Sequence, residues 1–146
     1  RAGYSIEFDD GVVLEILHPT TPPELGDALN EGVLVMRLVY GEVSFLLTGD
    51  ISREAQAEML LDGRWQTSTV MQLPQHGTVR SLDADFVEVI QPQAIVLQSD
   101  SANLRGDPHG DVLALLGDTP ILRTDDAGTV HLWTDGRELW TTIQMD

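Results

Sequence analysis

Asp50 lies where an apolar, strand-like segment, Phe45-Leu46-Leu47-Thr48-Gly49, gives way to a helix-like one. Glycine permits a backbone turn that a side chain would block, and a carboxylate beyond such a turn can hold or bridge metal ions. Open α/β sheets gather functional groups at strand ends of this kind. An aspartate directly before a helix also serves as a cap or turn residue, so the pattern alone leaves both roles open.

His76 lies in a second stretch of this type, VMQLPQHGT over residues 70–78. Pro74 stiffens the approach and Gly77 allows a sharp turn, so we expect the imidazole at a strand end. Histidine is a common zinc ligand and a general acid or base near neutral pH. We therefore predict His76 as a metal ligand or catalytic proton-transfer group, with an ordinary polar loop residue as the alternative.

A third cluster, GDPHGD, covers residues 106–111. Asp107, His109 and Asp111 either converge on a ligand or cap a helix expected to begin near Val112. Asp107 and His109 are accordingly further candidate metal ligands. Arg105 and Arg123 are possible phosphate contacts, although ordinary surface roles are the alternative.

The elements that must position these residues alternate between strands and helices. Helix periodicity supports the first helix, because Ile51, Ala55 and Met59 lie four apart, Ser52 can cap the first turn and Gly63 can end it. The expected strands cover residues 4–8, 12–17, 33–40, 43–47, 67–73, 94–98, 121–123, 129–134 and 138–143. The expected helices cover residues 52–62, 82–90 and 112–116, and residues 18–30 are expected to form a loop. This order predicts one layered α/β (α+β) domain over residues 1–146.

Composition restricts the function classes. Eight Lys and Arg residues against 24 acids give a formal charge of -16, so clustered basic contacts to a phosphate backbone are not expected of this segment alone. The acids either attract divalent metal or form a solvated surface. The chain has no cysteine, which excludes disulfides and thiolate sites, and no apolar stretch long enough to span a membrane. Because it begins at Arg1 rather than methionine, we expect a processed or excised part of a longer protein.

Four segments, taken in order, resemble the C-terminal half of the metallo-β-lactamase domain of ComEC-type competence proteins, over roughly residues 5–135. Members of that family have, in order, a TGD motif at the end of a strand, an HHG(S) motif, a segment of the form P..aiis...N.ygHP...vl..l, and a closing RTd..G.v. The matching segments here are NEGVLVMRLVYGEVSFLLTGDISREAQAEML, LPQHG, IQPQAIVLQSDSANLRGDPHGDVLALL and ILRTDDAGTVHLWTDG.

The resemblance implies half of an αββα sandwich, a mixed sheet with helices on one face, and descent from a metal-dependent hydrolase. In full competence proteins it implies a nuclease acting on the DNA strand that is not imported. Two divalent ions, zinc or manganese, would activate water and clamp a phosphodiester. Asp50 matches the aspartate of TGD and would bridge the metals, and His76 matches the second histidine of HHG.

Two departures weaken the implied metal site. Gln75 stands where the family has its first histidine, and a neutral amide is a poorer ligand than imidazole. Asp107 stands where the family has the histidine of HP, although His109 follows two residues later. The HxHxDH cluster of the N-terminal half is absent from this chain. Two explanations, which are compatible with each other, are that an upstream half carries that cluster and that the metal site has been lost, so that no metal binds.

Three functions remain open at this point. The chain could supply part of a binuclear site that cleaves DNA, form a non-catalytic scaffold of a DNA-uptake protein, or belong to another hydrolase of the superfamily. The expected partners are the N-terminal half of the same domain, a membrane channel domain, and DNA through the full-length protein. The resemblance places this soluble domain on the extracytoplasmic side of a bacterial membrane protein.

Overall fold

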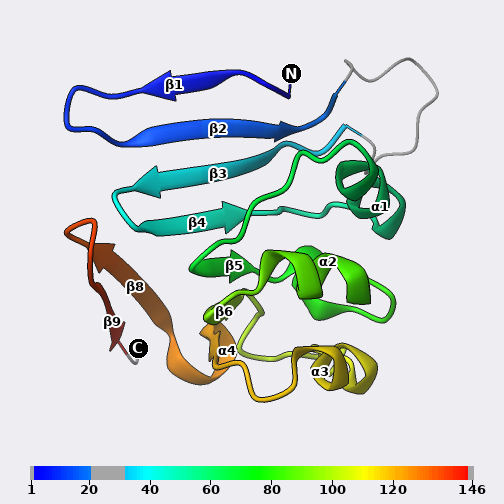
Figure 1. Ribbon diagram of the computed structural model, residues 1–146. Coiled ribbons are helices and arrows are strands. Elements are labelled where there is room, and N and C mark those ends of the chain that lie inside the picture. The colour runs from blue at the N-terminus through cyan, green and yellow to red at the C-terminus, as the bar shows by residue number, and fades with distance from the viewer. Residues whose placement is uncertain (1, 21–31, 145–146) are drawn as a thin grey trace.

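The computed structural model describes residues 2–20 and 32–144. They form a mixed seven-stranded sheet whose spatial order equals the chain order (Figure 1). Its strands are β1 (Ser5–Glu7), β2 (Val13–His18), β3 (Val35–Tyr40), β4 (Val43–Leu47), β5 (Val70–Gln72), β6 (Ala94–Leu97) and β7 (Ile121–Arg123). Strands β1 to β4 pair antiparallel, and β4 to β7 pair parallel.

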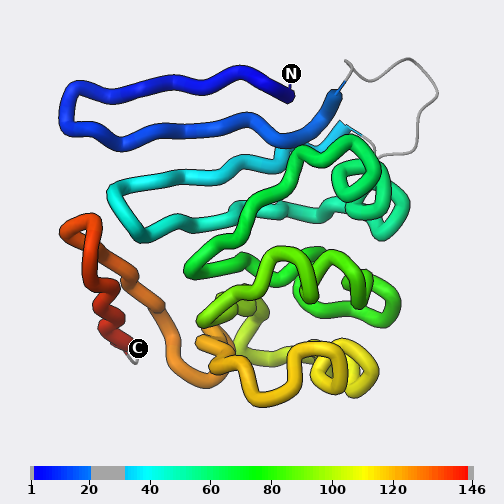
Figure 2. Tube along the Cα trace, in the orientation of Figure 1, coloured from blue at the N-terminus to red at the C-terminus, as the bar shows by residue number. Residues whose placement is uncertain are grey.

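Helices connect the parallel strands. The α-helices of the described residues are α1 (Arg53–Leu61), α2 (Ala84–Ile90), α3 (Gly110–Leu116) and the short α4 (Thr124–Ala127), and a 3-10 turn, η1 (Pro74–Gly77), follows β5. Because each crossover advances one strand in the same direction and crossovers are right-handed, α1, α2 and α3 cover one face of the sheet. The tube in Figure 2 shows the green to yellow part of the chain returning to the same side of the sheet each time.

The core lies between this helical layer and the central strands. Met71, Ile95 and Leu97 point from β5 and β6 toward Met59 of α1 and Phe86 of α2, and all five side chains are fully buried. Burying side chains of this size contributes roughly 1.5 to 3 kcal/mol each. The strands of the parallel half are therefore held firmly in register beneath the helices.

The opposite face of the sheet, called here the second face, is also apolar. One row of register partners crosses it from β1 to β6; at its outer end Ile6 is exposed and Leu14 is partly buried, whereas Val70 in β5 is buried. This row consists of Ile6, Leu14, Leu38, Phe45, Val70 and Ala94.

A two-stranded sheet follows, formed by β8 (Thr129–Thr134) and β9 (Leu139–Gln144). Its turn reaches the β3–β4 turn, where Glu42 donates its backbone N–H to the Gly136 carbonyl at 2.6 Å. Gly41 must be a glycine here, because it has a φ of 58° and a Cβ would overlap the Gly136 backbone. The hairpin expected across Asp135-Gly136 is thereby confirmed, with its tip at the amino end of β4.

The layered α+β prediction, with a mixed sheet and helices on one face, is confirmed. Each expected strand and helix has a counterpart whose ends lie within three residues of the expected ones. The expectation that the loop begins at residue 18 is wrong, because His18 still pairs with Val35 in β2 and its Nδ1 donates a hydrogen bond to the Val33 carbonyl at 2.7 Å. Most of that expected loop, residues 21–30, lies outside the described residues. No helix in the described ranges has the length and apolar character required to cross a membrane.

One buried amide joins α1 to α2. Gln56, fully buried on α1, donates from Nε2 to the Ser81 carbonyl at 2.8 Å and accepts from the Asp83 backbone N–H at 2.9 Å. Asp83 is also the N-cap of α2, where its carboxylate accepts the Asp85 N–H. The amide therefore satisfies two backbone groups at the start of α2 that no helical bond could reach.

We expect Gln56→Leu to lower the free energy of unfolding by about 2 kcal/mol, because a similar volume is kept while two backbone groups lose their partners. Urea denaturation would measure this change. Gln93→Leu is the matched control, since Gln93 is exposed, and it should change stability by less than about 0.5 kcal/mol. Equal effects of the two variants would contradict the assigned role of the Gln56 amide.

Candidate functional site

The carboxyl ends of β4, β5, β6 and β7 meet at one edge of the sheet, because these four strands run parallel. The segments that leave this edge contain most of the residues singled out in the sequence. Asp50 follows β4, His76 follows β5, and Thr124 follows β7. The topology therefore gathers residues that lie up to 74 positions apart, from Asp50 to Thr124, consistent with the usual location of sites in parallel sheets.

Asp50 and His76 lie opposite each other at this edge. Asp50 Oδ1 and His76 Nε2 are 3.8 Å apart, and both side chains are about half exposed. Capping of α1 falls to Ser52, whose hydroxyl accepts the Ala55 N–H at 3.2 Å. The capping role considered for Asp50 is thus filled by another residue, and its carboxylate faces the imidazole.

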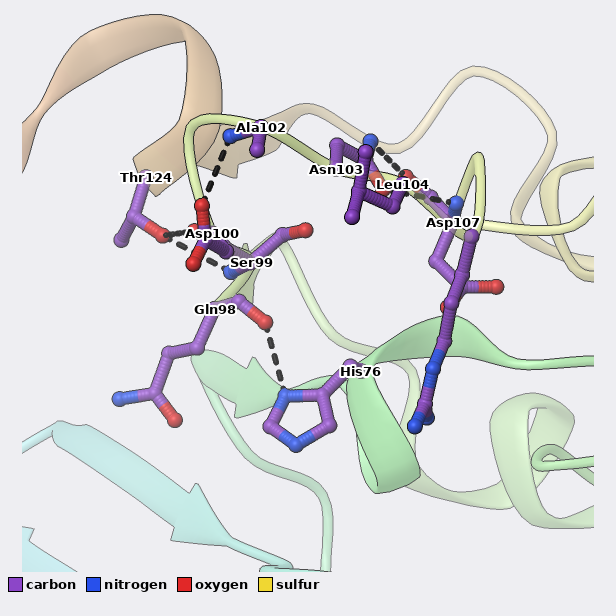
Figure 3. A pocket seen from close by; sticks show the side chains of 10 residues that line it. His76, Gln98, Ser99, Asp100, Ala102, Asn103, Leu104, Asp107 and Thr124 are labelled. Carbon is purple, nitrogen blue, oxygen red and sulfur yellow. Dashed lines mark hydrogen bonds between the residues drawn. The ribbon is translucent and has the colours of Figure 1, made fainter.

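A backbone carbonyl on the side of the ring away from Asp50 fixes the orientation of His76. Nδ1 lies 2.8 Å from the backbone carbonyl of Gln98, the bond drawn in Figure 3. A carbonyl only accepts hydrogen bonds, so Nδ1 carries the proton and, in the neutral ring, Nε2 holds the lone pair that faces Asp50. Metal-ligating histidines are commonly held in this way by a carbonyl behind the ring.

The backbone around His76 has an uncommon conformation. Gln75, His76 and Gly77 all have positive φ, at 48°, 57° and 74°. For residues with a Cβ this left-handed region costs roughly 1 to 2 kcal/mol each, so the surrounding contacts must hold the turn in place. They include the bond from Gln75 Nε2 to the Ile51 carbonyl at 3.0 Å and that from the His109 N–H to the Gly77 carbonyl at 2.8 Å.

Gln75 therefore has a structural part in the turn. Its side-chain amide bonds the backbone at the start of α1, and its own N–H donates to the Gly49 carbonyl at 3.3 Å. These two bonds tie the segment after β5 to the segment after β4, which carries Asp50. The amide that replaces an expected histidine thus helps to place Asp50 beside His76.

The other two candidate ligands occupy different places. Asp107 is nearly buried and lines the same hollow as His76. His109 is the N-cap of α3, where its Nδ1 accepts the Asp111 N–H at 3.2 Å. The structure thus brings Asp50 and His76 together, places Asp107 across the hollow, and assigns the capping role considered for this cluster to His109.

A metal ion would find two donors at the Asp50–His76 pair. Among residues 2–20 and 32–144, no group of three or more His, Cys, Asp or Glu side chains is arranged to hold an ion. Catalytic zinc sites take three protein ligands and a water. The described residues therefore offer part of a ligand set.

An ion-pair network at this edge was not anticipated. Arg123 donates to Asp125 from Nε at 3.0 Å and from Nη2, and Asn103 Nδ2 donates to the same carboxylate at 2.8 Å. The hydrogen bond from Arg123 holds the pKa of the nearly buried Asp125 below its usual range, and the pKa of Arg123 is raised in turn. The only signal in the sequence is the spacing of Arg123-Thr124-Asp125-Asp126.

An open hollow of about 680 Å³ lies beside His76. Figure 3 shows its wall, formed by the end of β6 and the loop that follows it. Within it, Thr124 Oγ1 donates to the Ser99 carbonyl and accepts the Ser99 N–H, which fixes the end of β6 to the start of α4. The lining residues include His76, Asp100, Asn103, Leu104, Arg105 and Asp107.

Comparison with known proteins gives two related competence proteins. The chain is 29% identical over 118 residues to ComE operon protein 3 of Bacillus subtilis (strain 168), an alignment that covers 80% of this chain and 15% of that protein. It is 30% identical over 127 residues to Competence protein ComA of Neisseria gonorrhoeae, covering 84% of this chain and 18% of that protein. No family model matches the chain.

These matches support a relationship to competence proteins over most of the chain. The chain spans less than a fifth of the length of either relative.

We expect Gly77→Ala to destabilise the protein more than Gly63→Ala. Both positions have positive φ, so both variants bear the left-handed cost of roughly 1 kcal/mol. At Gly77 a Cβ would also lie 2.7 Å from the Pro108 Cβ and 2.8 Å from Leu73 Cδ2, whereas nothing lies within 4 Å at Gly63. The extra loss should be about 1 to 3 kcal/mol by urea denaturation, and equal losses would contradict this packing.

We expect Asp125→Asn to lower the free energy of unfolding by about 2 kcal/mol at pH 7, since it removes the charged partner of Arg123 and Asn103. Because the folded pKa of Asp125 is depressed, its contribution is present above the unfolded pKa near 3.9 and is lost as pH falls through the folded value. The difference between wild type and variant should therefore shrink below about pH 4. Asp126→Asn, at an exposed partner of Arg123, should cost less than about 0.5 kcal/mol.

Proposed function

We propose that this chain is a domain of a competence protein that takes part in DNA uptake, and that Asp50 and His76 contribute to a divalent-metal site of hydrolytic type. The similarity to the two competence proteins supports the biological role. The chemistry rests on one observation above all, the Asp50–His76 pair with the His76 ring held by the Gln98 carbonyl.

Zinc or manganese fits this pair in part. His76 Nε2 and an Asp50 oxygen are both suitable donors, and their 3.8 Å separation allows one ion to touch both. Further ligands would have to come from outside the described residues, and the HxHxDH half of a metallo-β-lactamase-like domain is the proposed source. A bound ion would supply an activated water and charge neutralisation for a phosphodiester. The residues described here hold and orient the ligands.

The second face of the sheet supports this arrangement. Its apolar row begins at Ile6, which is 52% exposed, and Leu47 on the same face is 38% exposed. A second sheet packed face to face at about 10 Å spacing would bury the exposed outer part of this row and would complete an αββα sandwich. We propose the N-terminal half of the same domain as that second layer. From the family resemblance we also propose that the domain lies on the extracytoplasmic side, beside a membrane channel domain of the parent protein.

A non-catalytic scaffold in a DNA-uptake protein is the second candidate. The hydrogen bond of Gln75 favours this candidate. The residue at the position of an expected histidine ligand donates from its side-chain amide to the Ile51 carbonyl, which is a structural contact. In that case the fold and the Asp50–His76 pair persist without bound metal.

Metal analysis separates the two candidates. The full-length protein would be stripped with chelator, reloaded with zinc or manganese, dialysed and measured by mass spectrometry. We expect Asp50→Asn and His76→Ala to weaken metal binding at least tenfold, as is typical when the coordination of an ion is disturbed. His109→Ala is the matched control, because His109 caps α3, and it should retain the wild-type metal content.

Metal retained in both Asp50→Asn and His76→Ala would contradict the proposed ligands. Wild-type protein that binds neither metal would support the scaffold.

A further inference from the structure

We propose that the hollow beside His76 binds a single DNA strand, with Arg105 as the phosphate contact and Leu104 as the apolar contact for a base. The inference rests on the proposed function and names the substrate contacts of the same site. Both residues line the hollow together with His76. A strand lying in it would therefore bring a phosphate close to the Asp50–His76 pair.

Arg105 differs from the other arginines in its position beside His76. Four of them are engaged with carboxylates, namely Arg37, Arg53, Arg64 and Arg123. The guanidinium of Arg123 forms ion pairs with Asp125 and Asp126, so it is poorly placed to bind phosphate. Within the described residues Arg105 has no ion pair, as is also true of Arg80 and Arg137, and of these three only Arg105 lines this hollow.

Hydrogen bonds of Asn103 hold the loop that carries Arg105 in place. Asn103 accepts the Asp107 N–H at 3.0 Å and donates to the Asp107 carbonyl at 2.7 Å, while its amide also reaches Asp125. Figure 3 shows Asn103 and Leu104 across the hollow from the His76 ring. The position of the loop is thus tied to the Arg123–Asp125 pair.

Leu104 is 95% exposed, whereas the side chain of its neighbour Asn103 is hydrogen-bonded to Asp107 and Asp125. An exposed apolar side chain next to an unpaired guanidinium suits a nucleotide, which offers an apolar base face and a phosphate within the same unit. An unpaired base in a single strand can reach Leu104, whereas a stacked base within a duplex cannot.

Charge sets the expected strength. Asp100 and Asp107 also line the hollow, and the whole chain carries a formal charge of -16. One carboxylate oxygen of Asp100, Oδ1, accepts a hydrogen bond from the Ala102 N–H at 2.7 Å. The acidic surroundings repel a phosphate backbone, so we expect modest, salt-sensitive binding in which one cation has a large effect.

Fluorescence anisotropy of a labelled oligothymidylate, with full-length protein in chelator, tests this site without metal. We expect Arg105→Gln to weaken binding roughly three- to tenfold and to reduce the salt dependence by about 0.7 in the logarithmic slope, as for one lost phosphate contact on a single strand. Leu104→Ser should weaken binding without changing that slope. Arg137→Gln removes the same charge at the hairpin beyond the opposite edge of the sheet, and binding should stay within roughly twofold of wild type.

Equal effects of Arg105→Gln and Arg137→Gln would overturn the proposal, as would wild-type protein that does not bind the oligonucleotide. Tighter binding of a duplex than of the single strand would overturn the role of Leu104. Metal content, measured on the same variants, is read separately. If Arg105→Gln has no effect on DNA binding while Asp50→Asn loses metal, this inference fails and the proposed function stands.

Discussion

Burial of the parallel strands beneath three helices is the constraint on which the rest of the structure depends. Met71, Ile95 and Leu97 have no measurable exposure, and they pack against side chains of α1 and α2. Because a strand displaced by one residue would turn its buried side chains to the other face, this packing fixes where each strand ends. The positions of Asp50, His76 and the loop after β6 follow from those ends.

Hydrogen bonds between the strand-end segments complete the placement that the core begins. The Gln98 carbonyl aims the His76 ring, the Gln75 amide ties one strand-end segment to the next, and Asn103 joins the loop after β6 to Asp125. Each bond joins two segments that leave the same edge of the sheet. The edge is therefore a connected unit, although Asp50 and His76 themselves are half exposed.

Local sequence patterns predicted much of this arrangement. Apolar runs ending in Thr48-Gly49-Asp50 and Pro74-Gln75-His76-Gly77 marked two strand ends, and parallel pairing then brought Asp50 and His76 together. The Ser52 cap was also readable, because capping depends on residues within one turn of helix.

The features that escaped prediction depend on contacts between distant segments. Nothing near Gln75 in the sequence shows that its amide reaches the Ile51 carbonyl, or that Arg123 is paired with a buried Asp125 that also binds Asn103. The left-handed conformation of Gln75 and His76 is likewise uncommon for their residue types and requires the surrounding bonds. The choice for His109 between ligand and cap also needed the position of α3.

The apolar second face has a consequence for how copies of this protein meet in solution. Where no second layer covers it, the outer part of the row, from Ile6 to Phe45, is a surface on which two molecules could associate. Each copy also carries a formal charge of -16, so like charges repel before the faces touch. Since salt shortens the range of that repulsion to roughly 10 Å at 0.1 M, ionic strength controls how closely the copies approach. The formal charge therefore opposes association through this face, and added salt weakens that opposition.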